Sequence, residues 1–405
     1  MSSVDKPVYG RRVGEKDMAN KYKRWNLAIA GLVLCVVLWI VGMNYFVDPF
    51  GYFHFKGGDY GRIDFELTAD QYLRFLQAEH IKNFGNQYDA YIIGGSKTGS
   101  YRTEKLAEMD GYSYYNVWGM MGSVQNYYYY ARYILENTNV KKIIMNLSGG
   151  ETRAYDRQYL SDICVIPAQV KGGSVLLENL DFLFKDVHIA MDVWKESRDG
   201  DPSASVSNCV TGERNLEKYY RSRAKDPEAF VTKQVLKKFD KQMKRLFTKN
   251  LSHDAYEENL AAIREIKALC DKKGVEFVVM MAPSFIGEMS EHDCERYWEY
   301  MEELAVITDY WDFSGYHDIA LNPYNFYNDG HFLYEVTDLI VDTITGADCY
   351  EGFGEYVTLE NVYSHVQKRK ESYLALRQEY EATGTIRLQG YGDESNIVGD
   401  GGKYN

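Results

Sequence analysis

The sequence predicts an α/β protein, in which helices cover a parallel β-sheet, joined to one N-terminal transmembrane helix. Three features of the chain lead to this prediction. Residues 27–46 form an uncharged run, short apolar segments further along alternate with helical patterns, and a charged, aromatic stretch over residues 151–250 interrupts that alternation. Alternating strands and helices are typical of parallel sheets. We expect the interrupting stretch to be a mostly helical insertion.

The N-terminal part of the chain predicts a membrane anchor. Its uncharged run of 20 residues, at about 1.5 Å per residue, matches the roughly 30 Å hydrocarbon layer of a bilayer. Trp25 at one end and Tyr45 with Phe46 at the other fit the aromatic belts at membrane surfaces. A cleaved signal peptide would need a shorter apolar core and a small-residue cleavage site. A buried core helix would rarely be this long and apolar. We therefore predict a transmembrane helix over residues 25–47.

The charge around this helix predicts its orientation. Residues 1–24 carry seven Lys or Arg against three Asp or Glu, a net charge of +4, whereas the whole chain has a net charge of −13. Positive flanks stay in the cytoplasm. We therefore expect a single-pass protein of the cell membrane with a cytoplasmic tail over residues 1–24. An extracellular α/β domain would cover 48–350, starting with an extended stalk over 48–55, and a C-terminal helix with a disordered tail would cover 351–405.

The composition excludes several classes of function. Apolar residues make up 45% of the 405 residues, and the negative net charge argues against nucleic-acid binding. The six cysteines match no zinc pattern and the eight histidines show no H-E-x-x-H spacing, so we expect no metal and no cofactor. Five cysteines lie beyond the anchor, which leaves open either one or two disulfides or free thiols.

Local patterns predict the order of elements after the anchor. Apolar β-rich runs that end in small residues predict buried strands, and apolar residues at helical spacing predict helices. The expected strands cover residues 88–95, 112–119, 141–150, 275–283 and 306–313. The expected helices cover residues 68–85, 123–136 with Ser123 as N-cap, 254–273, 287–304, 333–345 and 355–382.

The carboxyl ends of parallel strands meet at one edge of a sheet, and ligands bind there. Loops 94–100, 116–123 and 146–151 follow three of the expected strands, and loop 325–332 precedes a helix near the end of the alternation. Together these loops offer a serine, glycine N–H groups, an acid and a histidine. The first loop, GGSKTGS, has its lysine in the wrong place for a phosphate-binding loop, which argues against nucleotide binding.

Ser96 and His331 are the candidate catalytic residues at this edge. A serine hydroxyl becomes a nucleophile when a base takes its proton, and a third group must hold that base in the right tautomer. Ser96 follows the first expected strand, where a turn would expose its hydroxyl, and His331 precedes a helix, with Asp329 two residues before it. Each residue taken alone is better explained as a helix-capping or surface residue. Their occurrence at opposite ends of one α/β chain favours catalysis.

Five motifs stand out along the chain: IIGGSKT (92–98), YYNVWGMMGSVQNYYYYARYIL (114–134), KKIIMNLSGGE (141–151), VEFVVMMAPS (275–284) and YWDFSG…NPYNFYNDGHFLYEVTDLIVDTI (310–344). They resemble the motifs of the SGNH (GDSL-like) hydrolases. More narrowly, they are similar to membrane-anchored envelope members related to the D-alanyl transfer proteins of teichoic acid synthesis and to the alginate O-acetylation proteins. The resemblance covers about residues 48–350 without the insertion, and it implies a flavodoxin-like, three-layer fold.

The resemblance implies a role for each matching residue. Ser96 takes the place of the nucleophile and His331 that of the base. The oxyanion hole would use the backbone N–H of Ser96 with Gly122 or Gly119, and Asn146.

The orienting acid departs from the usual family pattern. D-x-x-H would put an acid at position 328, where this chain has Asn328. Asp329 gives D-x-H instead, which is the spacing of the alginate-type relatives. Asp329 is therefore the expected acid, with Asn328 as a substitute at the acid position.

Two functions follow from the resemblance. In the first, Ser96 attacks an ester or thioester, and the acyl group passes to water or to a sugar hydroxyl. The substrate would be a cell-envelope polysaccharide or its acyl donor, and the partner a multi-pass membrane O-acyltransferase. In the second, the protein is a non-catalytic, membrane-tethered scaffold that binds a glycan or a membrane partner, which Asn328 favours. Its cleft would use aromatic residues that a core could equally bury: Tyr127–Tyr130, Tyr310, Trp311, Tyr324 and Tyr327.

Overall fold

A computed structural model of the chain forms two compact units. It describes residues 9–50, 52–54, 69–119, 123–153, 166–199, 207–208, 210–239, 241–242, 252–384 and 386–389. The first unit comprises Met1–His54 together with Ser174–Asp199, and the second comprises Phe55–Gly173 and Gly200–Asn405. The expected insertion over residues 151–250 is therefore divided, because its central part joins the anchor.

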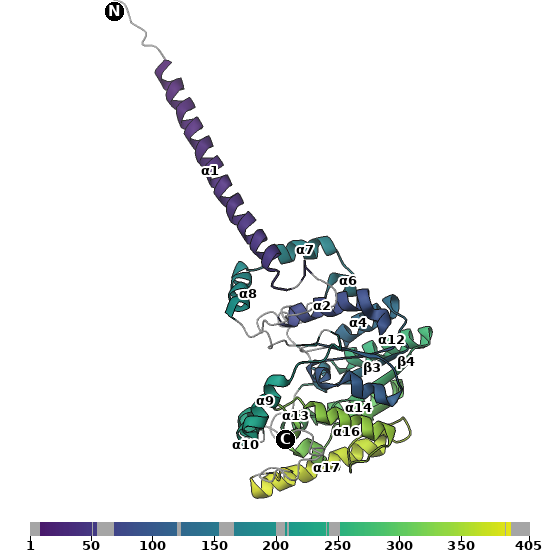
Figure 1. Ribbon diagram of the computed structural model, residues 1–405. Helices are drawn as coiled ribbons and strands as arrows, with labels where there is room; N and C mark the ends of the chain where they lie inside the picture. The colour runs from purple at the N-terminus through teal and green to yellow at the C-terminus, as the bar shows by residue number, and fades with distance from the viewer. Residues whose placement is uncertain are drawn as a thin grey trace, which may run out of the picture. The chain divides into compact units, whose positions relative to one another are not determined.

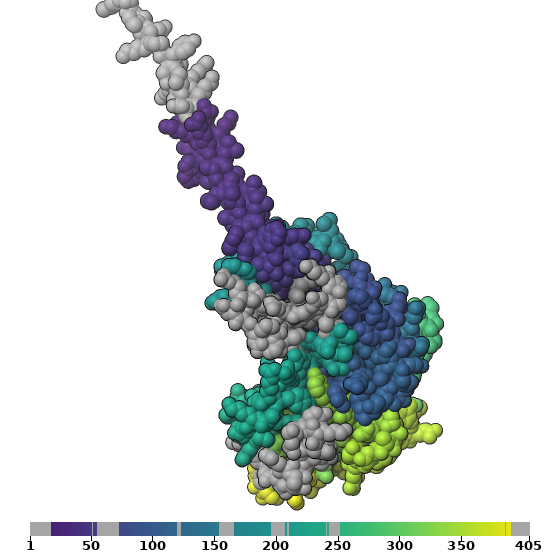
Figure 2. Space-filling view, in the orientation of Figure 1, coloured from purple at the N-terminus to yellow at the C-terminus, as the bar shows by residue number. Residues whose placement is uncertain are grey.

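The first unit is built on one long helix, α1 (Tyr9–Val47), drawn in purple in Figure 1. Its stretch Met18–Val47 is long and apolar enough to cross a membrane, and none of its most apolar window is buried (Figure 2). A core helix of a soluble protein would bury such a face. Two short helices complete the unit: α7 (Val175–Leu183) and α8 (Val187–Asp199).

The carboxyl end of α1 is fixed to the rest of this unit by a buried amide. Asn44 Nδ2 donates to the backbone oxygens of Leu183 at 3.0 Å and Lys185 at 2.8 Å. The residues that follow form a tight turn, not the expected extended stalk. The Asp48 carboxylate accepts hydrogen bonds from the backbone N–H groups of Tyr52 and His54, both at 2.8 Å, which folds the chain back on itself.

The second unit contains a six-stranded sheet with the order β2-β1-β3-β4-β5-β6. The first five strands are parallel, and β6 pairs antiparallel with β5. The parallel order 2-1-3-4-5 is a doubly wound order, whose switch point lies between β1 and β3. The strands are β1 (Ala90–Gly94), β2 (Tyr114–Trp118), β3 (Lys142–Leu147), β4 (Glu276–Met281), β5 (Tyr310–Asp312) and β6 (Glu355–Val357).

Helices cover both faces of this sheet (Figure 1). The longer ones are α2 (Ala69–Phe84), α4 (Val124–Asn137), α12 (Tyr256–Lys273), α14 (Glu295–Ile307), α16 (Tyr334–Thr345) and α17 (Val362–Thr383). The shorter ones are α3 (Thr103–Leu106), α6 (Ala168–Lys171), α9 (Glu217–Lys225), α10 (Pro227–Phe230), α13 (Ile286–His292) and α15 (Asp318–Leu321). Single turns are η1 (Gly85–Gln87), η2 (Ser96–Ser100), η3 (Ala107–Met109), η4 (Gly150–Thr152), η5 (Val231–Val235), η6 (Leu236–Lys238) and η7 (Pro323–Asn325).

The hydrophobic core is divided between the two faces of the sheet. Along β1, Tyr91 and Ile93 join a cluster with α4, α12 and α14, whereas Ala90 and Ile92 join a cluster with α3 and α16. This alternation follows from the two-residue period of a strand. It explains why β1 reads as a continuous apolar run in the sequence: both of its faces are buried.

The sequence predicted the early elements to within two residues at either end, except that the strand expected over 141–150 ends at Leu147. Ser123 caps α4 as expected, accepting from the backbone N–H of Asn126 at 3.4 Å. The later elements differ from the expectation in three ways. The helix expected over 287–304 is divided into α13 and α14, and the strand expected over 306–313 is reduced to β5. The segment expected to be one helix over 355–382 first forms strand β6, and α17 begins only at Val362. The sheet therefore continues beyond residue 350.

Among the cysteines that the structure describes, Cys35, Cys270 and Cys349 have free thiols. Cys164 and Cys209 lie outside the described residues. The described parts of the expected insertion are mostly helical, from α6 to η6.

Candidate functional site

The site begins where β1 ends at the carboxyl edge of the sheet. A Cβ atom on Gly94 would lie 2.1 Å from Thr98 Oγ1 and 2.6 Å from the backbone oxygen of Asn146, so only glycine allows this close approach. The chain then turns directly into η2, whose first residue is Ser96. Ser96 is partly exposed at the edge of the sheet.

His331 reaches the same point from a loop 235 residues further along the chain. Its Nε2 lies 2.6 Å from Ser96 Oγ. The loop is closed by a bridge between Phe326 and Phe332, and by the backbone N–H of Tyr327, which donates to the oxygen of His331 at 2.9 Å. The structure therefore brings together the two residues that the sequence singled out.

Asn328 determines which nitrogen of His331 carries the proton. Its Oδ1 accepts from the backbone N–H groups of Gly330 at 3.0 Å and His331 at 2.9 Å, and these two donors require an oxygen at that position. The same Oδ1 lies 2.9 Å from His331 Nδ1, which must therefore be protonated. Nε2 is left as an acceptor, so the Ser96 hydroxyl donates to it. This is the arrangement that a general base requires.

Asp329 does not occupy the position that the sequence predicted for it. Its Oδ2 pairs with Lys238 Nζ of η6 at 2.9 Å, and the Nδ1 atom of His331 is bound by Asn328 instead. The turn from Asn328 to His331 explains the difference. The side chain three residues before the histidine folds back to accept the N–H groups of the turn, which aims its oxygen at the ring.

The histidine is neutral at neutral pH. Partial burial lowers the pKa of His331 well below its ordinary range, and the positive charges of Arg214, Lys97 and Lys238 lower it further. The group that contacts Nδ1 is an uncharged amide, so it supplies no negative charge to raise this pKa. His331 can therefore accept a proton at neutral pH.

The expected oxyanion donors are placed differently from the prediction. The backbone N–H of Gly119 donates to the oxygen of Gly94 at 3.1 Å, so it is already used. The buried amide of Asn146 donates to Thr98 Oγ1 at 2.9 Å and accepts from the Tyr101 hydroxyl at 3.0 Å, which makes it a support for the η2 turn. Gly122 lies outside the described residues.

Two backbone donors remain beside the Ser96 hydroxyl. The N–H groups of Ser96 and Lys97 open η2 and donate no backbone hydrogen bond to any residue that the structure describes. The first turn of a helix presents such groups to negative charge. The sequence predicted the N–H of Ser96 as an oxyanion donor and did not single out that of Lys97.

The side chain of Lys97 is a second feature that sequence reasoning missed. It is buried, and its Nζ pairs with Glu288 Oε2 of α13 at 2.8 Å and donates to Ser284 Oγ. Glu288 in turn packs against the His331 loop, because a Cβ on Gly330 would lie 2.5 Å from Glu288 Oε2. This ion pair links the Ser96 turn to the His331 loop. No pattern in the sequence indicates that Lys97 and Glu288, which lie far apart along the chain, form an ion pair.

The aromatic residues expected to line a glycan cleft are mostly core residues. Most of them are buried, and the tyrosine hydroxyls of α4 bond internally, as Tyr127 donates to Glu151 Oε1 at 3.0 Å and Tyr130 to the oxygen of Arg74 at 2.9 Å. These tyrosines belong to the core cluster between α4 and the sheet, where a hydroxyl removed from water needs an internal partner. The buried members of the predicted set are Tyr127, Tyr130, Tyr310, Tyr324 and Tyr327.

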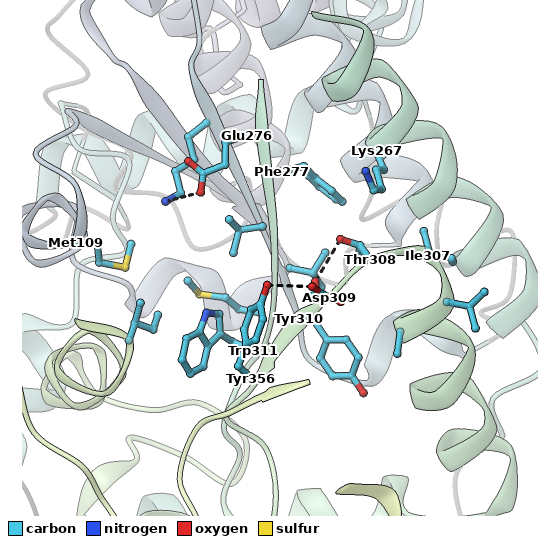
Figure 3. Close-up of a pocket in the computed structure, with 17 residues that line it drawn as sticks. Met109, Lys267, Glu276, Phe277, Ile307, Thr308, Asp309, Tyr310, Trp311 and Tyr356 are labelled. Carbon is cyan, nitrogen blue, oxygen red and sulfur yellow. Dashed lines mark hydrogen bonds and ion pairs between the residues drawn. The ribbon is translucent and has the colours of Figure 1, made fainter. Parts of the chain in front are cut away.

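Trp311 belongs to a cavity of about 640 Å³ away from the Ser96–His331 pair (Figure 3). This cavity lies at the amino end of β4, where Glu276, Phe277 and Val278 pair with β3 but have no partner on β5. Ser96 follows the carboxyl end of β1, so the cavity is at the opposite edge of the sheet. It is not part of the site described above.

Comparison with known proteins adds no family assignment. No protein-family model matches the sequence, and no curated protein sequence matches it significantly. Within the described residues, no group of three His, Cys, Asp or Glu side chains is arranged to hold a metal ion.

Proposed function

We propose that this chain is a membrane-anchored serine esterase or O-acyltransferase of the SGNH type, which forms an acyl intermediate on Ser96. One observation carries the proposal: Ser96 Oγ lies 2.6 Å from Nε2 of His331, whose other nitrogen is held by Asn328. A hydroxyl, an imidazole and a third group that fixes the imidazole are the parts of a nucleophilic triad, and Asn in the third place has a precedent in cysteine proteases.

The proposed reaction has two steps. The Ser96 oxygen attacks the acyl carbonyl while its proton passes to Nε2 of His331, and the N–H groups of Ser96 and Lys97 face the negative oxygen that forms. The intermediate collapses to acyl-Ser96, and His331 returns the proton to the departing alcohol or thiol. In the second step His331 takes a proton from water or a sugar hydroxyl, whose oxygen attacks the acyl group. The ester bond to Ser96 then breaks, and His331 returns the proton to the Ser96 oxygen.

Asn328 affects the energy of this reaction through its lack of charge. It orients the imidazole, but it offsets the positive charge on the imidazolium less than a carboxylate would. Lys97, Arg214 and Lys238 add to that cost, because they lower the pKa of His331. We therefore expect His331 to remain unprotonated, and able to act as a base, at a lower pH than an ordinary histidine. The same lowered pKa makes it bind a proton less strongly.

The substrate and the location are proposed from the anchor and the family resemblance. The apolar helix α1 supports attachment to a membrane, and the positive charge of residues 1–24 supports an extracellular site. A site at that position would act on a cell-envelope polysaccharide or its acyl donor, with a multi-pass membrane O-acyltransferase as partner.

The same geometry leaves one alternative, a non-catalytic scaffold that holds a glycan or a membrane partner. The observation that favours it is Asn328, the uncharged group in the orienting position.

A serine-reactive probe distinguishes the two functions. We expect a fluorophosphonate to label the full-length protein in detergent at Ser96, and Ser96→Ala to abolish labelling. Ser100→Ala is the matched control, since Ser100 lies in the same η2 turn without contact to His331, and it should still be labelled. Labelling that survives in Ser96→Ala would exclude Ser96 as the nucleophile. A folded wild-type protein that the probe does not label would favour the scaffold.

A further inference from the structure

Arg214 is held beside the Ser96–His331 pair by aromatic rings. Its guanidinium carbon lies 5.1 Å from the centre of the Trp118 ring and 5.6 Å from that of Tyr327. Its backbone N–H donates to the oxygen of Gly99 in η2 at 2.9 Å, and the Tyr327 ring lies 5.4 Å from the His331 ring. The positive charge therefore stands next to both elements of the site.

This arginine has no acidic partner among the residues that the structure describes. The neighbouring carboxylates are engaged elsewhere: Glu213 accepts from the backbone N–H and the hydroxyl of Thr103 at 2.6 and 2.7 Å, Glu288 pairs with Lys97, and Asp329 pairs with Lys238. Aromatic rings hold a guanidinium in place without neutralising its charge. In a chain with net charge −13, a cation that no described carboxylate neutralises, next to a reactive pair, is available to an anion.

We propose that Arg214 binds an anionic group, a carboxylate or a phosphate, on the substrate whose acyl group Ser96 takes. This rests on the proposed function above. A guanidinium offers parallel N–H groups that match two oxygens of such a group, which would fix the substrate relative to Ser96. Arg214 lies outside all five motifs that resemble the SGNH hydrolases. The proposed contact with an anion is therefore not taken from that resemblance.

Matched esters test the proposal on the full-length protein. The probes are 4-acetoxyphenylacetate, 4-acetoxybenzylphosphonate and the neutral 4-acetoxyphenylacetamide. We expect kcat/KM to favour at least one anionic ester over the neutral one by roughly tenfold or more, and the two anionic probes to distinguish carboxylate from phosphate recognition. Arg214→Gln should remove that preference and Arg214→Lys should restore part of it. Arg221→Gln, which changes an exposed arginine of α9, is the control and should keep the preference.

Equal kcat/KM for anionic and neutral esters, or a preference that survives in Arg214→Gln, would overturn the proposal. A second readout does not depend on turnover. The products 4-hydroxyphenylacetate and 4-hydroxybenzylphosphonate should raise the thermal midpoint of wild-type protein but not of Arg214→Gln. If Ser96 proves unreactive, the esterase proposal fails, but the change in thermal midpoint still tests the anion site. An equal change in wild type and Arg214→Gln, or no change in either, excludes that site.

A separate observation concerns α7, whose apolar side chains face outward. Phe182 is buried, whereas the residues on the opposite side of the helix are exposed. Their i, i+1, i+4 and i+8 spacing places them on one face. The exposed fractions are 68% for Leu176, 67% for Leu177, 44% for Leu180 and 56% for Phe184. A soluble surface rarely leaves such a continuous apolar face open to water.

The position of this face within the first unit identifies what covers it. Asn44, near the carboxyl end of α1, binds the end of α7. Helix α7 therefore lies beside the carboxyl end of the apolar stretch of α1. We infer that α7 lies in the interface of the same bilayer that α1 spans, with Leu176, Leu177 and Leu180 among the lipids. The inference rests on α1 crossing a membrane, and it is independent of the Ser96 chemistry.

Photo-crosslinking tests this inference with purified full-length protein in vesicles of phosphatidylethanolamine and phosphatidylglycerol. Benzoyl-phenylalanine at position 177 should form lipid adducts, detected by mass spectrometry. The same group at position 192, the exposed Asp192 of α8, is the control and should form few. Leu180→Glu should reduce the adducts at position 177. Adducts to protein alone would show that a second copy of the chain covers α7. Equal lipid adducts at positions 177 and 192, or no lipid adducts at either, would also exclude the placement of α7 in the bilayer interface.

Discussion

The amide oxygen of Asn328 lies 2.9 Å from Nδ1 of His331, in the place that an acid occupies in most serine hydrolase triads. Two backbone N–H groups bind the same oxygen, so the amide cannot turn its nitrogen toward the ring. Orientation and charge, which a carboxylate supplies together, are thus separated here. The first two predictions below follow from that separation.

The first prediction compares the two residues before His331. Asn328→Ala should slow fluorophosphonate labelling of Ser96 by roughly 100-fold or more, because the imidazole loses the group that fixes its tautomer. Asp329→Asn should change the rate by no more than about twofold, since it removes only a partly exposed ion pair with Lys238. The labelling rates of the two variants, measured beside wild type, check this. The reverse order would restore Asp329 as the orienting acid.

The second prediction concerns pH. Labelling requires neutral His331, and its lowered pKa means that the wild-type rate should persist below pH 6.5 and fall only in more acidic solution. Asn328→Asp places a negative charge at Nδ1, which raises the pKa of His331. The acidic limb of the rate profile should therefore move to higher pH, by about one unit. Rates measured from pH 4.5 to 8 test the direction, and a shift to lower pH would contradict it.

The third prediction concerns the contact between Gly330 and Glu288. A methyl group on Gly330 would lie 2.5 Å from Glu288 Oε2 and must displace either the carboxylate or the His331 loop. Gly330→Ala should therefore slow Ser96 labelling by roughly tenfold, since small misplacements of a base are costly. Gly173→Ala, whose added carbon has ordinary contacts at 3.6 Å, is the control and should react like wild type. Equal rates in both variants would show that the contact does not position His331.

The fourth prediction concerns stability in acid. His317 is buried, its Nδ1 accepts from the backbone N–H of Ala320 at 3.1 Å, and burial lowers its pKa to about 4. In the unfolded chain its pKa is about 6.5. Between these values the unfolded state binds the proton and the folded state does not, so the free energy of unfolding falls as the pH drops from 6.5 to 4.

Replacing this histidine should remove part of that loss. His317→Asn keeps a capping oxygen without a titrating group, so the decrease in unfolding free energy between pH 7 and 4.5 should be smaller by about 2–3 kcal/mol. Urea unfolding at the two pH values measures it. His188→Asn, at an exposed histidine of α8, should leave the decrease as it is in wild type. An unchanged decrease in His317→Asn would mean that other groups cause the acid loss.

Much of the fold could be predicted because its signals are local. The continuous apolar run of β1 and the helical spacing of α12 depend on residues that are neighbours in sequence, and their burial follows from periodicity. The break between α13 and α14 has no such signal, since it is held by Asp293, which binds the distant Arg369 at 2.8 Å. Likewise, β6 carries no pattern of its own and becomes a strand through pairing with β5.

The sequence by itself determined the apolar helix α1, the parallel sheet and the meeting of Ser96 with His331, because parallel strands bring the loops at their carboxyl ends to one edge whatever lies between them. Only the tertiary structure decided that Asn328 orients the imidazole, that Lys97 is paired with Glu288, and that Arg214 lies against the rings of Trp118 and Tyr327. Those contacts depend on the direction in which each side chain leaves its turn, and one-dimensional spacing does not contain that direction.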